Sequence, residues 1–305
     1  MTKDFLQITD FTTEEIYETF DIAGELKVGE SIYEGILKGK TVACIFTKPS
    51  LRTRISFETG IYELGGYSLY VTDKEIQLGV RESIYDAAKV LSRFVSMIMI
   101  RTFDHSDVEQ LAEHADVPVI NGLTDLTHPC QVMGDMLTAK EHLGRLENLK
   151  VAFLGDGNNV FNSWMNLACR IPMELRLGTS PKTLPDQKIL KKTEEAGKSK
   201  VIVTHDAAEA VSGVDVIYTD VWASMGQKEK AKEKAELLKD FQVNDELLAK
   251  ADPSCIVMHC LPANRGEEIT DSVMDGKHSV VFDEAENRLH IQKAIMVQLM
   301  RNHLG

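Results

Sequence analysis

The sequence has no surplus of basic residues. Its 305 residues include 34 Lys and Arg against 47 Asp and Glu, which gives a formal net charge of −13. A chain with this charge has little general attraction for nucleic acid or for anionic membrane surfaces. We therefore expect neither as a partner, and any site for an anionic ligand must be built locally.

The sequence also lacks paired cysteines and long hydrophobic runs. The five cysteines are odd in number, widely spaced and without a C-x-x-C pair, which is untypical of a secreted disulfide framework. No run of about 18 apolar residues is present, and the N-terminus does not start with a basic segment followed by an apolar core. These absences predict a protein of a reducing compartment, the cytoplasm, unless a presequence has been removed.

The pattern along the chain predicts an α/β fold. A capping box from Thr12 to Glu15 opens a first helix. β-rich runs then alternate with amphipathic segments, which predicts two domains, each an open parallel sheet with helices on both faces. The predicted strands are 41–46, 67–71, 96–101 and 117–120 in the first half, and 150–154, 174–178, 200–204, 215–219, 255–259 and 279–282 in the second.

The alternation pauses at 144–148, and we place the domain boundary there. The first domain is then 1–143 and the second 148–285. The last segment, 286–305, is rich in apolar residues and is expected to form a helix that packs back on the first domain. The Lys, Glu and Ala run 227–239 predicts an exposed helix or loop.

The most informative motif is the segment 46–54, where an apolar run ends and hydroxyl and guanidinium groups gather. A predicted strand precedes this turn and a predicted helix follows it, so free N–H groups at the helix N-terminus favour an anion there. Ser50, Arg52, Thr53 and Arg54 add donors that suit phosphate oxygens. The segment predicts a site for a small phosphate ester or anhydride. The alternative is a solvated helix face that happens to carry two arginines.

Other polar residues follow predicted strands, where ligands of open α/β sheets bind. In the first half these are Arg101, His128 and Gln131, which suit a ligand rich in acceptors. Taken singly, Arg101 could be a structural ion-pair partner and His128 a cap or core residue. In the second half, Asp220 follows one strand and Cys260 another.

The second half offers groups of mixed character: an amide, a carboxylate, a hydroxyl and an apolar contact. This combination predicts a pocket for a small zwitterionic or cationic ligand, although Asp220 could instead cap a helix. The residues concerned are Asn159, Asp220, Ser224 and Met225.

Two further patterns predict cofactors only weakly. The segment 155–160 begins like a dinucleotide fingerprint, but Val160 replaces its third glycine and the next strand does not end in an acid. His128, Cys130, His259 and Cys260 could in principle ligate zinc, yet they lack the usual ligand spacing. We expect no metal and no nicotinamide cofactor.

Several motifs together resemble a known family. The motifs are Ser50-Leu51-Arg52-Thr53-Arg54, Arg101-Thr102-Phe103, His128-Pro129-Cys130-Gln131, Asp220-Val221-Trp222-Ala223-Ser224-Met225-Gly226 and His259-Cys260-Leu261-Pro262. In their order and spacing the chain resembles the ornithine carbamoyltransferases, within the aspartate/ornithine carbamoyltransferase superfamily, and the resemblance covers essentially the whole chain.

The resemblance implies a reaction without cofactor, in which the δ-amine of L-ornithine attacks carbamoyl phosphate to give citrulline and phosphate. It implies a homotrimer, or a multiple of trimers, with shared active sites, and a cis bond before Pro262. The implied catalytic residues are Arg101, His128, Asp220 and Cys260. Those for carbamoyl phosphate are Ser50, Leu51, Arg52, Thr53, Arg101, His128, Gln131, Cys260, Leu261 and Arg288, with Gln77 from a neighbouring subunit. Those for ornithine are Asn159, Asp220, Ser224 and Met225.

The chain departs from the family pattern in two places. Leu51 stands where a second threonine is common, and Asn264 replaces a frequent histidine. Two alternatives stay open on the residues: a transferase that uses putrescine or another amine, and a non-catalytic relative that keeps the anion site. A role in arginine biosynthesis follows only if the reaction runs toward citrulline.

Overall fold

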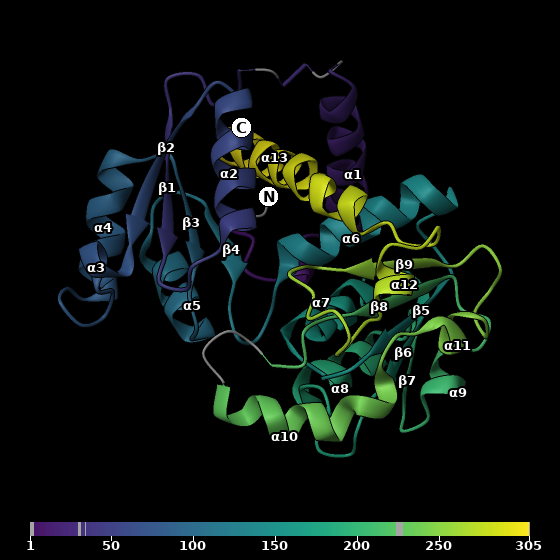
Figure 1. Ribbon diagram of the computed structural model, residues 1–305. Coiled ribbons are helices and arrows are strands. Elements are labelled where there is room, and N and C mark those ends of the chain that lie inside the picture. The colour runs from purple at the N-terminus through teal and green to yellow at the C-terminus, as the bar shows by residue number, and fades with distance from the viewer. Residues whose placement is uncertain (1–2, 30–31, 34, 224–227, 305) are drawn as a thin grey trace. The chain divides into compact units, whose positions relative to one another are not determined.

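The computed structural model describes residues 3–29, 32–33, 35–223 and 228–304 (Figure 1). The chain divides into two compact units, Met1–Gly134 with Glu286–Gly305 and Asp135–Ala285. Each unit contains one open parallel sheet, as the sequence predicts. Among the described helices, none is long and apolar enough to cross a membrane.

The first unit contains a four-stranded sheet in the order β2-β1-β3-β4. In Figure 1, α4 and α2 flank this sheet on opposite sides. The strands are β1 (Thr41–Phe46), β2 (Tyr67–Thr72), β3 (Met97–Arg101) and β4 (Val119–Leu123). The helical elements are η1 (Ile8–Asp10), α1 (Thr13–Val28), α2 (Leu51–Glu63), α3 (Asp73–Ile76), α4 (Ile84–Phe94) and α5 (His105–His114).

The second unit contains a five-stranded sheet in the order β7-β6-β5-β8-β9. Its strands are β5 (Leu149–Leu154), β6 (Met173–Gly178), β7 (Lys200–Thr204), β8 (Val216–Thr219) and β9 (Ile256–His259). Its helical elements are α7 (Asn159–Ala168), α8 (Gln187–Ala196), α9 (Ala207–Val211), α10 (Lys228–Leu238), η2 (Lys239–Phe241), α11 (Asp245–Leu248) and α12 (Asp271–Met274).

Two long helices belong partly to each unit. The division of the chain falls inside α6 (Pro129–Leu143) and near the start of α13 (Val281–Leu304). The domain limits that we expect from the sequence, 1–143 and 148–285, assign all of α6 to the first domain. The C-terminal helix packs against the first unit, as predicted: Lys293 pairs with Glu63 over 2.6 Å, and Arg301 with Glu18 over 2.5 Å.

The strand predicted at 279–282 is wrong. Ser279 makes a single bridge to Val257, and α13 already begins at Val281. Val280 and Val281 are buried, but their burial comes from the entry into this helix, where the Glu284 N–H donates to the Val280 carbonyl. A short apolar, β-branched run has the same sequence pattern whether it forms a buried strand or the buried start of a helix.

The strand order places the functional candidates. It reverses between β1 and β3 in the first unit, and between β5 and β8 in the second. In open parallel sheets, ligands bind beyond the carboxyl ends of the strands at such a reversal. Each unit therefore has one favoured position for a site.

Candidate functional site

The turn after β1 is a helix N-terminus lined with hydroxyl groups. Ser50 is the N-cap of α2, and its Oγ accepts the Thr53 N–H over 3.3 Å. The Ser50 hydroxyl also donates to Thr53 Oγ1 over 3.1 Å. The strand, turn and helix predicted from the sequence are thus confirmed here, and they aim backbone N–H groups at the end of β1.

Two buried arginines converge on Thr53. Arg101 ends β3 and donates to Thr53 Oγ1 over 3.3 Å, and Arg288 of α13 donates to the same oxygen over 2.9 Å. Their residues are only 6% and 3% exposed. Two guanidinium groups held this close repel each other, so an anion placed between them would lower the electrostatic energy.

His128 lies beside these cations. Burial, and then the positive charges of Arg288, Arg101 and Lys48, hold the pKa of His128 well below its usual 6.5. The imidazole is therefore neutral at pH 7 and can donate one hydrogen bond without adding charge. The His128 carbonyl also accepts the Gln131 N–H at the start of α6. His128 therefore also caps this helix, the alternative considered from the sequence.

The sequence interpretation did not assign a role to Lys48. This lysine is buried, lies 3.1 Å from Asp125 and sits over the ring of Phe103. It contributes positive charge at His128 from the same turn as Ser50. Lys48 lies within the 46–54 motif, and this position in the sequence could have identified it as a candidate site residue.

The arginines of the motif differ in what they contact. Arg54 pairs with Glu58 over 3.0 Å and lies 3.8 Å from the ring centroid of Tyr70, so it is directed away from Thr53 and its cation partners. Arg52 is half-buried, and no hydrogen bond or ion pair within the described ranges engages its guanidinium. Leu51 is 71% exposed at the first position of α2. Arg52 rather than Arg54 is available to a ligand.

Gln77 is exposed on the surface of the first unit. It ends α3 with φ +42°, a left-handed conformation that is uncommon for a residue with a Cβ atom. The turn after it is closed by the Gly79 N–H, which donates to the Glu82 carbonyl over 2.9 Å.

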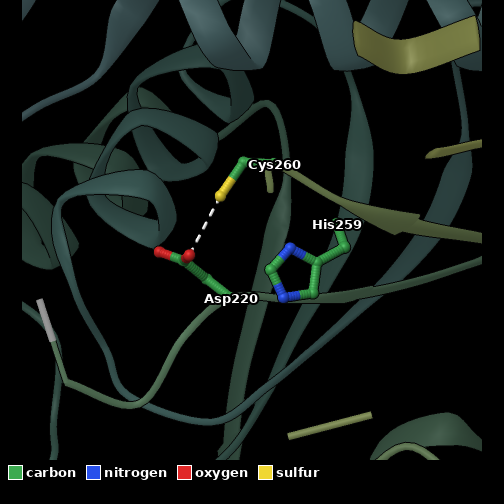
Figure 2. A group of neighbouring side chains, drawn as sticks. All are labelled: Asp220, His259 and Cys260. Atoms are coloured by element: carbon green, nitrogen blue, oxygen red, sulfur yellow. Dashed lines mark hydrogen bonds between the residues drawn. The ribbon is translucent and has the colours of Figure 1, made fainter. Parts of the chain in front are cut away.

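In the second unit, Asp220 follows β8 and accepts hydrogen bonds on both carboxylate oxygens (Figure 2). Oδ1 accepts the Cys260 thiol over 2.9 Å and the Val221 N–H over 2.8 Å. Oδ2 accepts the Asn158 side-chain amide over 2.7 Å. No helix begins at Asp220, so the alternative of an N-cap is excluded.

Cys260 faces Asp220 as a neutral thiol. Burial, and then the nearby charge of Asp220, raise the pKa of Cys260 well above its usual 9.0. The thiol therefore acts as a hydrogen-bond donor to the carboxylate rather than as a thiolate. Leu261 follows with φ +56° and a cis peptide bond to Pro262, the isomer that the family resemblance implies.

Asn158 is a second residue to which the sequence interpretation gave no role. Its side-chain oxygen accepts the N–H groups of Val160 and Phe161 at the start of α7, while its amide nitrogen orients Asp220. Asn159, the predicted ligand, is the first residue of α7. Ser224 and Met225 lie outside the described residues.

The metal and dinucleotide alternatives can be tested against these contacts. Asp220, His259 and Cys260 offer ligand atoms within 4.8 Å of one another, but both ring nitrogens of His259 already have partners. A Cβ atom on Gly157 would lie 2.5 Å from the Pro185 nitrogen. That glycine allows a close backbone contact within the unit, which explains it without a nucleotide.

Comparisons with known proteins agree on one family. The model of the aspartate/ornithine carbamoyltransferase carbamoyl-P binding domain matches residues 3–141, and that of the Asp/Orn binding domain matches residues 147–299. The ornithine carbamoyltransferase of Carboxydothermus hydrogenoformans is 55% identical, over 98% of this chain and 97% of the relative.

Solved structures show the same likeness. The ornithine carbamoyltransferase of Pyrococcus furiosus superposes with a TM-score of 0.94 at 46% identity, over 98% of this chain and 97% of that one. The anabolic ornithine carbamoyltransferase of Campylobacter jejuni has a TM-score of 0.93 at 35% identity, over 98% and 99% of the two chains.

Proposed function

The chain belongs to the aspartate/ornithine carbamoyltransferase family, and we propose that it transfers the carbamoyl group of carbamoyl phosphate to the δ-amino group of L-ornithine. The products are L-citrulline and phosphate. The observation that carries the choice of donor is the convergence of Arg101 and Arg288 on Thr53, next to a neutral His128. The choice of acceptor rests on the relatives and on the Asp220 and Cys260 pair.

The first unit holds the donor. The phosphate is bound by the N–H groups at the start of α2, including that of Leu51. The side chains of Ser50, Arg52 and Thr53 add further donors. Arg101 and Arg288 lie where charge develops on the carbonyl and leaving oxygens, and such fixed donors stabilise a transition state more than a ground state. Neutral His128, which lies beside these cations, and Gln131, whose N–H bonds to the His128 carbonyl, donate to the carbamoyl group.

The second unit presents the nucleophile. An alkylammonium group resembling lysine has a pKa of about 10.4, so only a few molecules in ~10⁴ are neutral at pH 7. Asp220 binds the δ-ammonium group and orients it, and the Cys260 thiol fixes the carboxylate. Leu261 adds backbone contacts to the reacting groups, and Asn159, with Ser224 and Met225, binds the amino-acid end of ornithine. The ammonium group loses one proton to solvent before attack, a loss that Asp220 and Cys260 assist, because only the neutral amine is a nucleophile. The amine nitrogen then bonds to the carbamoyl carbon, the bond from that carbon to the phosphate oxygen breaks, and the second proton leaves on the phosphate.

An assay of citrulline formation tests this function. At saturating carbamoyl phosphate, L-ornithine should be turned over far faster than putrescine, which lacks the α-carboxylate and α-amine. Faster turnover of putrescine would assign the chain to the related amine transferases. Binding of carbamoyl phosphate without any carbamoylated product would identify a non-catalytic relative.

The chain acts as a homotrimer in which Gln77 completes the site of a neighbouring subunit. Exposed apolar residues of the first unit support this: Tyr67 on the edge strand β2 is 65% exposed, Val80 in the Gln77 turn is 87% exposed, and Phe94 at the end of α4 is 73% exposed. Exposed large apolar groups and an uncovered edge strand are features that protein interfaces commonly cover. Gln77 is itself exposed, in the turn that follows α3.

The cytoplasm is the compartment that we propose for the chain. All five cysteines are free thiols, and Cys260 is the one that is not fully buried. A reducing environment keeps such thiols intact.

A further inference from the structure

The loop that follows β9 is closed at its base by two side chains. His259 ends β9, and Glu268 lies near the far end of the loop, shortly before α12 begins at Asp271. Both side chains are 0% exposed, and His259 Nε2 lies 3.0 Å from Glu268 Oε1. Since Cys260 and Leu261 are the first residues of the loop, a constraint at its base is also a constraint on them.

The hydrogen bonds of His259 define its tautomer. The Leu261 N–H donates to His259 Nδ1 over 2.9 Å. A nitrogen that accepts a hydrogen bond carries no proton, so the neutral ring is protonated at Nε2 and donates from there to Glu268. The imidazole therefore links the Leu261 backbone on one side to the Glu268 carboxylate on the other. It has no nitrogen left for Asp220 or Cys260, and Figure 2 draws a hydrogen bond only between those two.

Glu268 accepts hydrogen bonds from the residue before the loop and from a residue within it. Its Oε1 accepts the His259 ring proton and also the Asn264 N–H, the latter over 2.5 Å. Its Oε2 is buried and has no hydrogen-bond partner among the described residues. A buried carboxylate oxygen without a partner is unfavourable for stability, so packing alone does not explain a glutamate at this position.

The turn that these residues hold is itself unfavourable in isolation. Leu261 has φ +56°, which a residue with a Cβ atom adopts only when its surroundings impose it. The Leu261 N–H bond to His259 fixes this conformation directly. The preceding residue, Cys260, then places its thiol 2.9 Å from Asp220.

We propose that His259 and Glu268 are positioning residues that hold the Cys260–Leu261 turn so that the Cys260 thiol meets Asp220. Neither touches a substrate; each acts through the turn. The catalytic significance of this role rests on the proposed function, whereas the geometry of the turn does not.

The test compares three variants at Glu268 and its neighbour. Glu268→Gln keeps a carbonyl oxygen that can accept both donors, and Glu268→Ala removes the acceptor. Glu267→Ala is the matched control, because Glu267 is exposed and forms hydrogen bonds through its backbone N–H and carbonyl. Two readouts are taken on protein whose melting temperature shows that it is folded: the rate of Cys260 alkylation by iodoacetamide, located by mass spectrometry, and kcat for citrulline formation.

We expect Glu268→Ala to be alkylated at Cys260 at least ~10-fold faster than wild type and to lose ~10²-fold in kcat, because a small misplacement of reacting groups costs about that much. Glu268→Gln should recover most of both values, and Glu267→Ala should match wild type. If Glu268→Ala does not fold, His259→Asn carries the test with the same expectations, since its amide cannot reach Glu268.

A folded Glu268→Ala protein with wild-type alkylation and kcat would overturn the proposal. A wild-type protein that forms no citrulline would instead overturn the proposed function. In that case the alkylation rates alone still decide whether Glu268 positions the turn.

Discussion

At the scale of residues, local contacts distinguish the two arginines of the proposed phosphate site. Arg52 and Arg54 look equivalent in the sequence, and both were expected to bind the anion. Positions two apart on a helix do not share a face. Arg54 consequently contacts Glu58 and Tyr70, whereas Arg52 stays available. The sequence indicated that arginines gather at the start of α2, but it did not indicate which of them the helix turns towards other side chains.

We expect Arg52→Ala and Arg101→Ala to lower kcat at least ~10²-fold, because each removes a fixed donor to charge that develops in the transition state. Arg54→Ala should change kcat far less, since its guanidinium is engaged elsewhere. Steady-state kinetics of the three purified variants make the comparison. An Arg54→Ala loss as large as that of Arg52→Ala would contradict this assignment.

The protonation of His128 makes a prediction about stability and pH. Its pKa in the folded chain lies well below the unfolded value of 6.5, because of burial and nearby cations. As the pH falls below 6.5, only the unfolded chain binds this proton, which favours unfolding. The free energy of unfolding therefore decreases from pH 6.5 down to the pKa of His128 in the folded chain. Between about pH 7.5 and pH 5.5, wild type should therefore lose more free energy of unfolding than His128→Gln. Urea unfolding measures both, and parallel pH dependences would speak against a depressed pKa.

At the scale of elements, the sequence predicts the strands and their polar ends well. Arg101 ends a strand, and Asp220 and Cys260 each follow one, as expected, because a parallel sheet brings the carboxyl ends of its strands to one edge. The failure at 279–282 has a physical cause: Val280 and Val281 are buried by a helix start, which periodicity over four residues cannot distinguish from a strand. The sequence did not reveal the role of Asn158. An asparagine at this position is explained by the helix cap alone, and its contact with Asp220 depends on the fold.

The capping box of α1 gives a prediction at this scale. Thr12 Oγ1 accepts the Glu15 N–H over 3.2 Å, and the Glu15 carboxylate accepts the Thr12 N–H over 2.9 Å, as the sequence predicts. Thr12→Ala should lower the free energy of unfolding by about 1 kcal/mol. Thr12→Ser, which keeps the hydroxyl, should cost much less in the same urea titration. Equal losses would mean that the hydroxyl is not what stabilises the helix start.

For the whole molecule, the proposed sharing of sites predicts complementation between two inactive variants. Gln77→Ala and Arg101→Ala should each be nearly inactive alone. When the two proteins are unfolded, mixed and refolded together, some sites combine Arg101 of one subunit with Gln77 of another and regain activity. Activity in the mixture no higher than the sum of the separately refolded variants would show that each chain supplies its own Gln77.

The path of the chain through the two units has a consequence for synthesis. The second unit is one continuous segment, Asp135–Ala285, whereas the first needs Glu286–Gly305 as well, and Ile291, Ile295 and Leu299 of that segment are fully buried. During translation, the second unit can therefore fold as soon as it leaves the ribosome. The first unit must wait, with its apolar surface open to chaperones, until 286–305 has also been synthesised.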